Sequence, residues 1–233
     1  MNKEKGSVIS VIVPIHVQNE EIPEVRKSIF YATTPIEVIY VIDKNLSGII
    51  EDTKSFEKVI KIEKKGRGFM LKGGVLNSSG DIILFLHSDT ILSKGWDISI
   101  RNSLKDETVI GGGFRLKFNI ESVYLDLVVK ILTFNTERVK ILSGDRALFV
   151  RSYLIKNNLS TLDMPIMEDM ELSFLMRNQG KVVILNQNVI TSAQAFKKNG
   201  IFRQAIRIII SFIWYRIGGN LQDIYNFYYS KGK

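Results

Sequence analysis

The sequence alternates between apolar runs bounded by turn residues and segments whose apolar residues recur with a helical period. In the first half, the apolar runs predict strands at residues 7–15, 36–43, 58–62 and 81–87. The segments between them predict helices at residues 20–32, at 66–80 and, weakly, at 49–56. Because the strands are almost continuously apolar, we expect a mainly parallel sheet that helices bury on its faces.

The second half is less regular but continues the same alternation. Its strands are predicted at residues 109–119, 144–150 and 181–192, and its helices at 95–106, 122–140 and 167–180. From about residue 195 the chain is helical and basic. No linker separates the two halves, so we expect one α/β domain over residues 1–195 and a helical appendage over residues 196–233.

The chain of 233 residues, 45% of them hydrophobic, is long enough for one substantial core. It has no cysteine, which excludes disulfides and thiolate metal sites and suits a reducing compartment. We find no signal peptide, and the apolar run at residues 208–215 is much shorter than the roughly 20 residues that span a bilayer. We therefore expect a cytoplasmic protein, either soluble or peripheral on the inner face of the membrane.

The net charge of +8 indicates an anionic partner, such as a nucleotide phosphate or an anionic lipid. Nucleic acid is not expected as a partner, because the sequence contains no recognition module for it.

Charged residues stand at the ends of the predicted parallel strands, where such sheets bind ligands. Asp43 is either a turn former or a carboxylate that accepts hydrogen bonds from a ribose or a base. Asp89 is either a turn residue or a ligand for Mg²⁺ or Mn²⁺ shared with substrate phosphates. His87 is either a second metal ligand or a core histidine.

Other motifs are ambiguous when taken alone. The sequence "GRG" at residues 66–68 is only loosely similar to a phosphate-binding loop, and its spacing does not fit a Rossmann motif or a P-loop. Glu168 and Asp169 fall in the first turn of a helix, a position that the helix dipole alone favours for acidic residues. The glycines of "GGGF" at residues 111–114 allow either close approach to a ligand or a bulge.

The order of these motifs is more specific than any one of them. The stretches "GRGFMLKGG", "LFLHSDT", "GGGFRL", "GDRALFVR" and "MEDMELS" occur in sequence. Over roughly residues 7–195, this series resembles glycosyltransferase family 2, and within it a compact bacterial branch. The resemblance implies the GT-A fold.

The resemblance also implies roles for individual residues. The donor-binding residues would be Pro14, Glu20, Asp43, Arg67, Ser88 and Asp145. Asp89 would bind a divalent metal, with His87 as a possible second ligand. Asp169 would be the catalytic base and Glu168 its partner, while Gly144 and Asp145 would lie near the acceptor.

The sequence departs from the family pattern in several places. The stretch "PIHVQNEE" lengthens the first motif, which leaves the register of Glu20 open. Asp43 is kept, but the second aspartate that usually follows it is lost. Lys72 replaces a common asparagine, and His87 stands where many members have aspartate, as is normal in this branch.

On this resemblance we expect an inverting, metal-dependent glycosyltransferase of the hexosyltransferase type. It would move a sugar from a nucleotide diphosphate sugar to a small-molecule, lipid or glycan acceptor. The alternatives are a nucleotidyltransferase-like enzyme and a catalytically weak nucleotide-binding module of the same fold.

The C-terminal segment predicts an amphipathic helix. One face carries Phe202, Ile206, Ile209, Ile213 and Ile217, another carries Arg203, Arg207 and Ser211, and Trp214 and Tyr215 suit an interface. The helix is expected to contact a membrane surface or a partner chain, as in a homodimer. The alternative is a helix packed on its own domain.

Overall fold

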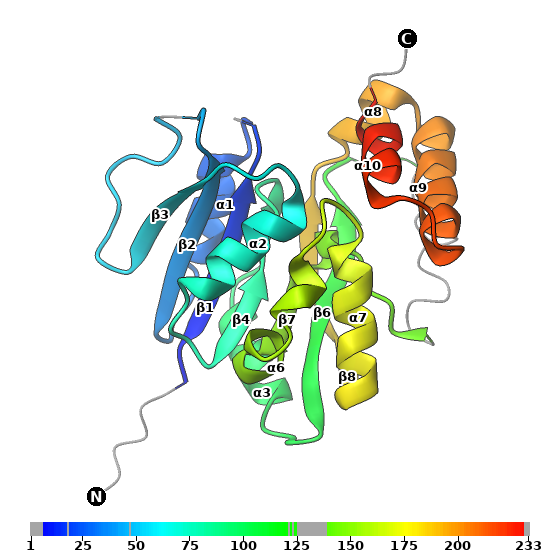
Figure 1. Ribbon diagram of the computed structural model, residues 1–233. Helices are drawn as coiled ribbons and strands as arrows, with labels where there is room; N and C mark the ends of the chain where they lie inside the picture. Colours follow the sequence, from blue (N-terminus) through cyan, green and yellow to red (C-terminus); the bar gives the residue numbers. More distant parts are fainter. Residues whose placement is uncertain are drawn as a thin grey trace, which may run out of the picture.

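The computed structural model describes residues 7–17, 19–46, 48–120, 122, 124 and 139–230. These residues form one mixed sheet with the strand order β3-β2-β1-β4-β7-β6-β8-β5 (Figure 1). The strands are β1 (Ile9–Ile15), β2 (Ile36–Asp43), β3 (Glu57–Ile62), β4 (Ile82–Phe85), β5 (Thr90–Ile91), β6 (Val109–Phe118), β7 (Leu148–Arg151) and β8 (Lys181–Thr191).

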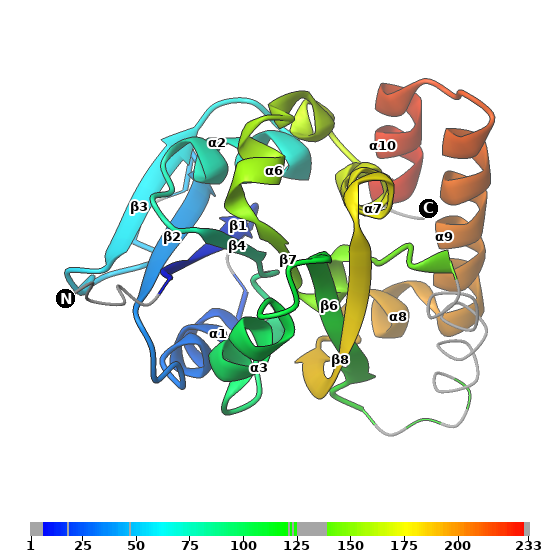
Figure 2. The same ribbon diagram turned by 90° about the horizontal axis from the view of Figure 1, so that it is seen from below.

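Helices cover both faces of the sheet. One face carries α1 (Ile22–Ile29) and α3 (Trp96–Ser103), and the other carries α2 (Arg67–Leu76), α6 (Ser152–Lys156) and α7 (Glu168–Gln179) (Figure 2). The short 3-10 turns η1 (Gly144–Arg146) and η2 (Leu159–Leu162) precede β7 and α7. The result is a three-layer α/β arrangement.

The parallel half of the sheet follows from its apolar strands. β1 pairs in parallel with β2 and β4, and β2 pairs in parallel with β3. Side chains alternate along β1, so Val11 and Val13 pack in the core cluster that includes α1 and α3, while Ile12 packs in the cluster with α2 and α7. Both faces of β1, β2 and β4 are buried, as the continuous apolar runs predict, whereas the edge strand β3 is partly exposed.

The other half is mixed in direction. β7 pairs antiparallel with both β4 and β6, β6 pairs in parallel with β8, and β5 pairs antiparallel with β8. The β6–β8 register shifts between Val109 and Gly111, and a Cβ on Gly111 would lie 2.4 Å from the carbonyl oxygen of Phe149. The glycine run therefore serves irregular pairing and close packing between strands.

Two predicted elements differ from the structure, and a third lies almost entirely outside the described residues. The weak helix at residues 49–56 is wrong: Gly48 (φ 67°) and Asp52 (φ 49°) both take left-handed backbone conformations, which interrupt a helix. The strand predicted from residue 144 starts only at Leu148, after η1. The long helix predicted at residues 122–140 falls almost entirely outside the described residues.

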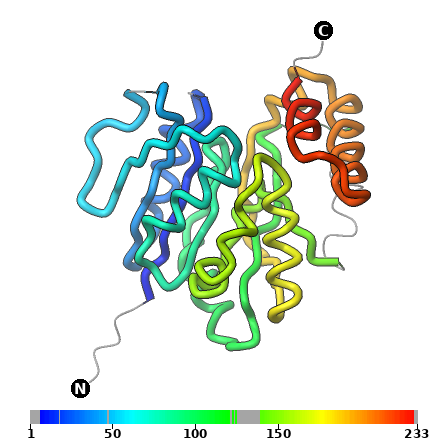
Figure 3. Tube along the Cα trace, viewed as in Figure 1, coloured from blue at the N-terminus to red at the C-terminus, as the bar shows by residue number. Residues whose placement is uncertain are grey.

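The C-terminal helices pack against the sheet domain. They are α8 (Gln194–Asn199), α9 (Ile201–Arg216) and α10 (Leu221–Tyr229). Figure 3 follows the chain from the end of β8 through these helices, and α10 lies beside the first turn of α7 in Figures 1 and 2. The boundary expected at residue 195 falls inside α8. The division of the chain into a domain and a separate C-terminal segment stays a prediction. Within the described part of the chain, no helix has both the length and the apolar character needed to span a membrane.

Candidate active site

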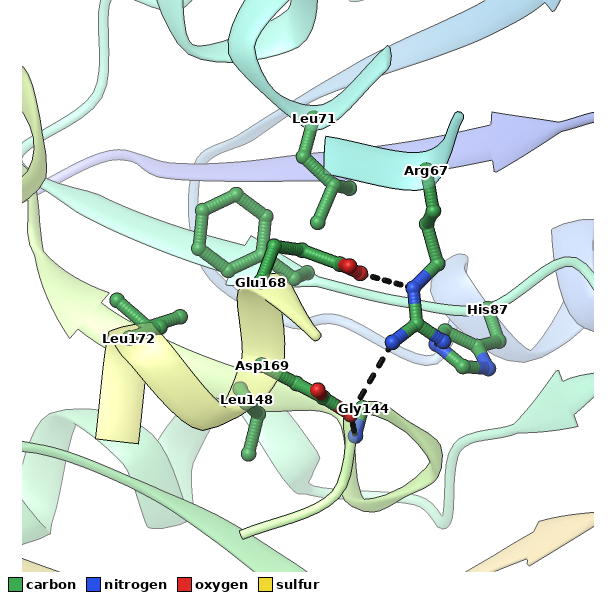
Figure 4. Close-up of a pocket in the computed structure, with 9 residues that line it drawn as sticks. Arg67, Leu71, His87, Gly144, Leu148, Glu168, Asp169 and Leu172 are labelled. Carbon is green, nitrogen blue, oxygen red and sulfur yellow. Dashed lines mark hydrogen bonds and ion pairs between the residues drawn. The ribbon is translucent and has the colours of Figure 1, made fainter. Parts of the chain in front are cut away.

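A small pocket opens beyond the end of β4, and one guanidinium lies at its centre. Arg67, the first residue of α2, reaches toward Glu168 and Asp169 in the first turn of α7 (Figure 4). Its Nε donates to Glu168, and its Nη2 lies 3.1 Å from Oδ2 of Asp169. Its Nη1 lies 2.7 Å from Nε2 of His87. The pocket is completed by Gly144 and by the apolar side chains of Leu71, Phe85, Leu148 and Leu172.

The backbone brings these groups together. The N–H of Arg67 donates to the carbonyl oxygen of Pro165, 3.1 Å away, so the start of α2 is fixed to the loop before α7. Ala147 (φ 48°) and Met167 (φ 71°) hold left-handed conformations beside η1 and Glu168. Such strain costs roughly 1–3 kcal/mol per residue and persists where the surroundings fix the backbone, often at functional sites.

Glu168 and Arg67 form a buried ion pair. Glu168 is fully buried, and burial raises the pKa of its carboxyl group although Arg67 opposes this. Burial also opposes the charge of Arg67, but Glu168 and Asp169 outweigh it and raise the pKa of the guanidinium. Oε2 of Glu168 has no hydrogen-bond partner among the described residues. The charges in this pocket therefore depend on one another.

Asp169 is held by two groups from distant parts of the chain, in addition to the neighbouring N–H of Met170, which donates to its Oδ1 over 2.9 Å. Besides Arg67, the N–H of Gly144 donates to its Oδ2 over 2.8 Å. Gly144 has no room for a side chain, because a Cβ there would lie 2.5 Å from Nε2 of His87. The carboxylate of Asp169 is thus fixed at the pocket wall.

His87 links the pocket to Asp145. Its Nδ1 lies 2.8 Å from Oδ1 of Asp145, and Arg67 donates to its Nε2, so Nδ1 carries the hydrogen in this arrangement. Its side chain is 17% exposed, so it is not a core histidine. Both ring nitrogens are engaged, and a metal could bind His87 only if one of these contacts broke. The surrounding protein opposes ionisation of Asp145, but the hydrogen bond from His87 lowers its pKa.

Asp89 lies within a group of carboxylates. Burial and the neighbouring charges of Asp145 and Glu21 raise the pKa of Asp89. Glu21 accepts a hydrogen bond from Ser192 (2.8 Å), while its Oε2 is buried and lacks a hydrogen-bond partner among the described residues. The residue implied by the resemblance, Glu20, is exposed. The sequence offered two adjacent glutamates, and only the fold shows that Glu21 acts on Asp89.

Asp89 and the two carboxylates whose charges act on it do not form a closed metal site. In the described residues, no three acidic or histidine side chains gather closely enough to hold a metal ion. A divalent cation at Asp89 would therefore take most of its ligands from water and from a substrate diphosphate, as Mg²⁺ commonly does.

The remaining predicted donor residues lie at the ends of β1, β2 and β4. Pro14 is buried within β1, and Asn19 donates to the hydroxyl of Ser88 over 3.0 Å. Oδ1 of Asp43 accepts from the N–H of Asn45 (2.9 Å), which lowers the pKa of Asp43 and makes it a turn former. That role leaves a ligand contact at the other oxygen open.

His16 directly follows β1 at this edge of the sheet, whereas Lys72 lies away from it. The surrounding protein, together with the charges of Arg67 and His87, lowers the pKa of His16 to about 4, although the residue is exposed. Lys72, which departs from the family pattern, pairs with Asp163 at 2.6 Å beside a separate shallow depression. The substitution at Lys72 therefore forms a surface contact outside the pocket.

Comparisons with known proteins agree with this architecture. The family model for Glycosyl transferase family 2 matches residues 10–152. The crystal structure of S. aureus TarS 1–349 in complex with UDP-GlcNAc is similar at a TM-score of 0.60 and 18% identity, over 95% of this chain and 72% of that chain. A mycobacterial protein is similar at a TM-score of 0.57 and 17% identity, over 92% of this chain and 76% of that chain. No curated protein matches the sequence. The expected GT-A fold is confirmed.

Proposed function

The chain belongs to glycosyl transferase family 2, and we propose that it moves a sugar from a nucleotide diphosphate sugar to an acceptor hydroxyl with inversion of the anomeric carbon. The main support is the convergence of Glu168, Asp169 and His87 around the guanidinium of Arg67. This pocket lies beyond the carboxyl end of a parallel strand, where α/β sheets bind ligands. The UDP-GlcNAc complex of TarS supports a hexose derivative as the transferred sugar.

Asp169 is the proposed general base. The acceptor hydroxyl gives its proton to the carboxylate of Asp169 as its oxygen attacks the anomeric carbon. The bond from that carbon to the diphosphate oxygen breaks, and the diphosphate leaves with the bonding electrons. Contacts from Arg67 and Gly144 fix the carboxylate, so positioning supplies part of the rate. A single displacement of this kind inverts the anomeric configuration.

Glu168 has a supporting role in this proposal. It is fully buried and engages the Nε side of Arg67, so it fixes the guanidinium that in turn holds Asp169. We therefore expect Glu168 to position the base rather than to contact the acceptor.

The donor is assigned to the side of the pocket formed by the ends of β1 and β2. Pro14, His16 and Asp43 lie there, and His16 is close enough to Arg67 for their charges to interact. Asp89 is the proposed protein ligand for Mn²⁺ or Mg²⁺, because Glu21 and Asp145 add negative charge beside it. When bound, the cation would neutralise charge on the departing diphosphate.

Nucleotide binding and donor turnover test this proposal. Titration calorimetry of the full chain with UDP and other nucleoside diphosphates, with and without Mn²⁺, should give metal-dependent binding of at least one nucleotide. Incubation with the matching nucleotide sugar should then release the nucleoside diphosphate. Release of a sugar 1-phosphate instead would favour a nucleotidyltransferase, since that reaction breaks the bond between the two phosphates. Binding without any turnover would favour a catalytically weak module.

The C-terminal helix α9 is proposed to contact an anionic membrane surface. The predicted apolar face, which consists of Phe202, Ile206, Ile209, Ile213 and Ile217, is exposed, and Ile210 of the same helix is exposed as well. The exposed bases Lys197, Lys198 and Arg203 lie beside it, and the net charge is +8. Apolar and basic groups together fit an anionic lipid surface. Trp214 and Tyr215 do not join this face, since they pack against the buried cluster of Ile166, Met167 and Ile224.

A further inference from the structure

The last helix of the described chain is fixed against the candidate active site. Ile224 of α10 is fully buried beside Ile166 and Met167, which directly precede Glu168. The hydroxyl of Tyr215 in α9 donates to Glu171 of α7. The C-terminal helices therefore form part of the wall around the first turn of α7.

Three tyrosines of α10 form a cluster at this wall. The ring centroids of Tyr225 and Tyr229 are 4.7 Å apart, and those of Tyr228 and Tyr229 are 5.1 Å apart. Tyr225 and Tyr228 pack against the Ile166–Met167 cluster, while Tyr229 is 50% exposed. The cluster thus combines anchored rings with one ring that is open to solvent.

The phenol groups lie close to the catalytic charges. The charges of Arg67 and Glu168 act on Tyr229, and those of Asp145 and Arg67 act on Tyr228. Although half of Tyr229 is exposed, the surrounding protein raises the pKa of its phenol to about 12 against the opposing charge of Arg67, so its hydroxyl is a neutral hydrogen-bond donor at neutral pH. The charge of the base Asp169 acts on both Tyr228 and Tyr229, whereas Asp43 lies at the end of β2, the side assigned to the donor.

We propose that Tyr225, Tyr228 and Tyr229 form the acceptor subsite, and that the acceptor group bound there is a sugar ring. A pyranose presents an apolar C–H face and a rim of hydroxyls. Tyrosine rings offer a matching apolar surface with a polar tip at a low conformational cost. The base Asp169 must meet the acceptor hydroxyl, and this cluster packs against Ile166 and Met167, which precede the Glu168–Asp169 pair in the chain. The inference rests on the proposed glycosyltransferase function.

Saturation-transfer NMR on the full chain tests the subsite. The probes are methyl α- and β-hexopyranosides and disaccharides, added in the presence of UDP and Mn²⁺. Tyr229→Ala and Tyr225→Ala should each weaken binding of the best probe about tenfold, while Tyr229→Phe should weaken it by no more than about threefold. Tyr153 is 59% exposed on α6, so Tyr153→Ala is a matched control that should bind as the wild type does.

The affinity for UDP distinguishes a failure of the acceptor subsite from a failure of the proposed function. It should change by less than about twofold in every tyrosine variant, because the cluster lies away from the donor side. Sugar binding that is unchanged in Tyr229→Ala, or absent from a wild type that binds UDP, overturns the acceptor subsite alone. A wild-type chain that binds no nucleotide overturns the proposed function, and the subsite with it.

Discussion

Replacing Arg67 with methionine would remove the group on which the charge balance of the pocket depends. The guanidinium pairs with Glu168 and Asp169, whose side chains are 1% and 15% exposed. In Arg67→Met, Glu168 keeps a buried carboxylate without a cation. Loss of one partner from a buried ion pair costs about 3–5 kcal/mol, since the other charge stays desolvated. At roughly 2–4 °C per kcal/mol for a chain of this size, Tm should fall by about 6–20 °C.

The loss of stability should also depend on pH. Burial raises the pKa of Glu168 in the folded protein, and Arg67 opposes that rise. Without Arg67 the folded pKa rises further, so the folded chain holds a proton that the unfolded chain releases. Stability is then greatest below the ordinary glutamate pKa and is lost as pH rises through the raised value, by up to about 1.4 kcal/mol per pH unit. Arg67→Met should therefore be closer to the wild type at about pH 5 than at about pH 8.

Denaturation followed by circular dichroism measures both effects. Adding Glu168→Gln to Arg67→Met should restore about half of the lost stability and flatten the pH dependence, because no buried charge remains at that position. Arg26→Met is the matched control: Arg26 pairs with the buried Glu57 at 2.8 Å, away from the pocket. It should lower stability without changing nucleotide affinity. A Tm loss below about 2 °C in Arg67→Met, or one that is constant with pH, would refute the reasoning.

Three further predictions concern the base, the metal and the exposed helix face. Asp169→Asn should lower turnover by about 10²- to 10⁴-fold in steady-state kinetics, with little change in nucleotide affinity by calorimetry, and Glu168→Gln should lower turnover less. Normal turnover of Asp169→Asn would contradict the mechanism, as would an NMR spectrum showing that the product retains the donor's anomeric configuration. Asp89→Ala should abolish the gain in nucleotide affinity that Mn²⁺ produces while the protein stays folded, and an undiminished gain would exclude Asp89 as the ligand. Ile213→Glu should reduce sedimentation of the protein with anionic liposomes at low salt. Ile98→Glu, which changes an equally apolar exposed residue on α3, should not reduce it. A wild-type protein that does not sediment with liposomes would rule out the membrane contact.

Local pattern in the sequence predicted most of the fold. The strand at residues 36–43 was placed to the residue, and the helix that contains Glu168 and Asp169 starts and ends where its first acidic turn and Gly180 indicate. These elements could be predicted because burial on both faces of a strand leaves a continuous apolar run in the sequence, and a helix leaves an apolar period of about 3.6 residues. The helix predicted at residues 49–56 has only a weak period, and the left-handed Asp52 interrupts it.

Only part of the candidate site could be predicted from the sequence. The motif series placed Asp89, Asp169 and Arg67 at an edge of the sheet, but it did not show that Arg67 contacts Glu168, a residue 101 positions away in the chain. It gave Glu20 a place in the donor pocket, which stays a prediction, and it did not show that the charge of the neighbouring Glu21 acts on Asp89.

The sequence alone determined where the strands and helices lie and which polar residues stand at their ends, because these features depend on residues that are neighbours in the chain. The tertiary structure decided the antiparallel direction of β7, the engagement of both nitrogens of His87 and the position of the α10 tyrosines beside α7. Strand direction and side-chain contacts depend on packing between distant segments, and no local period records which distant surface a residue will meet.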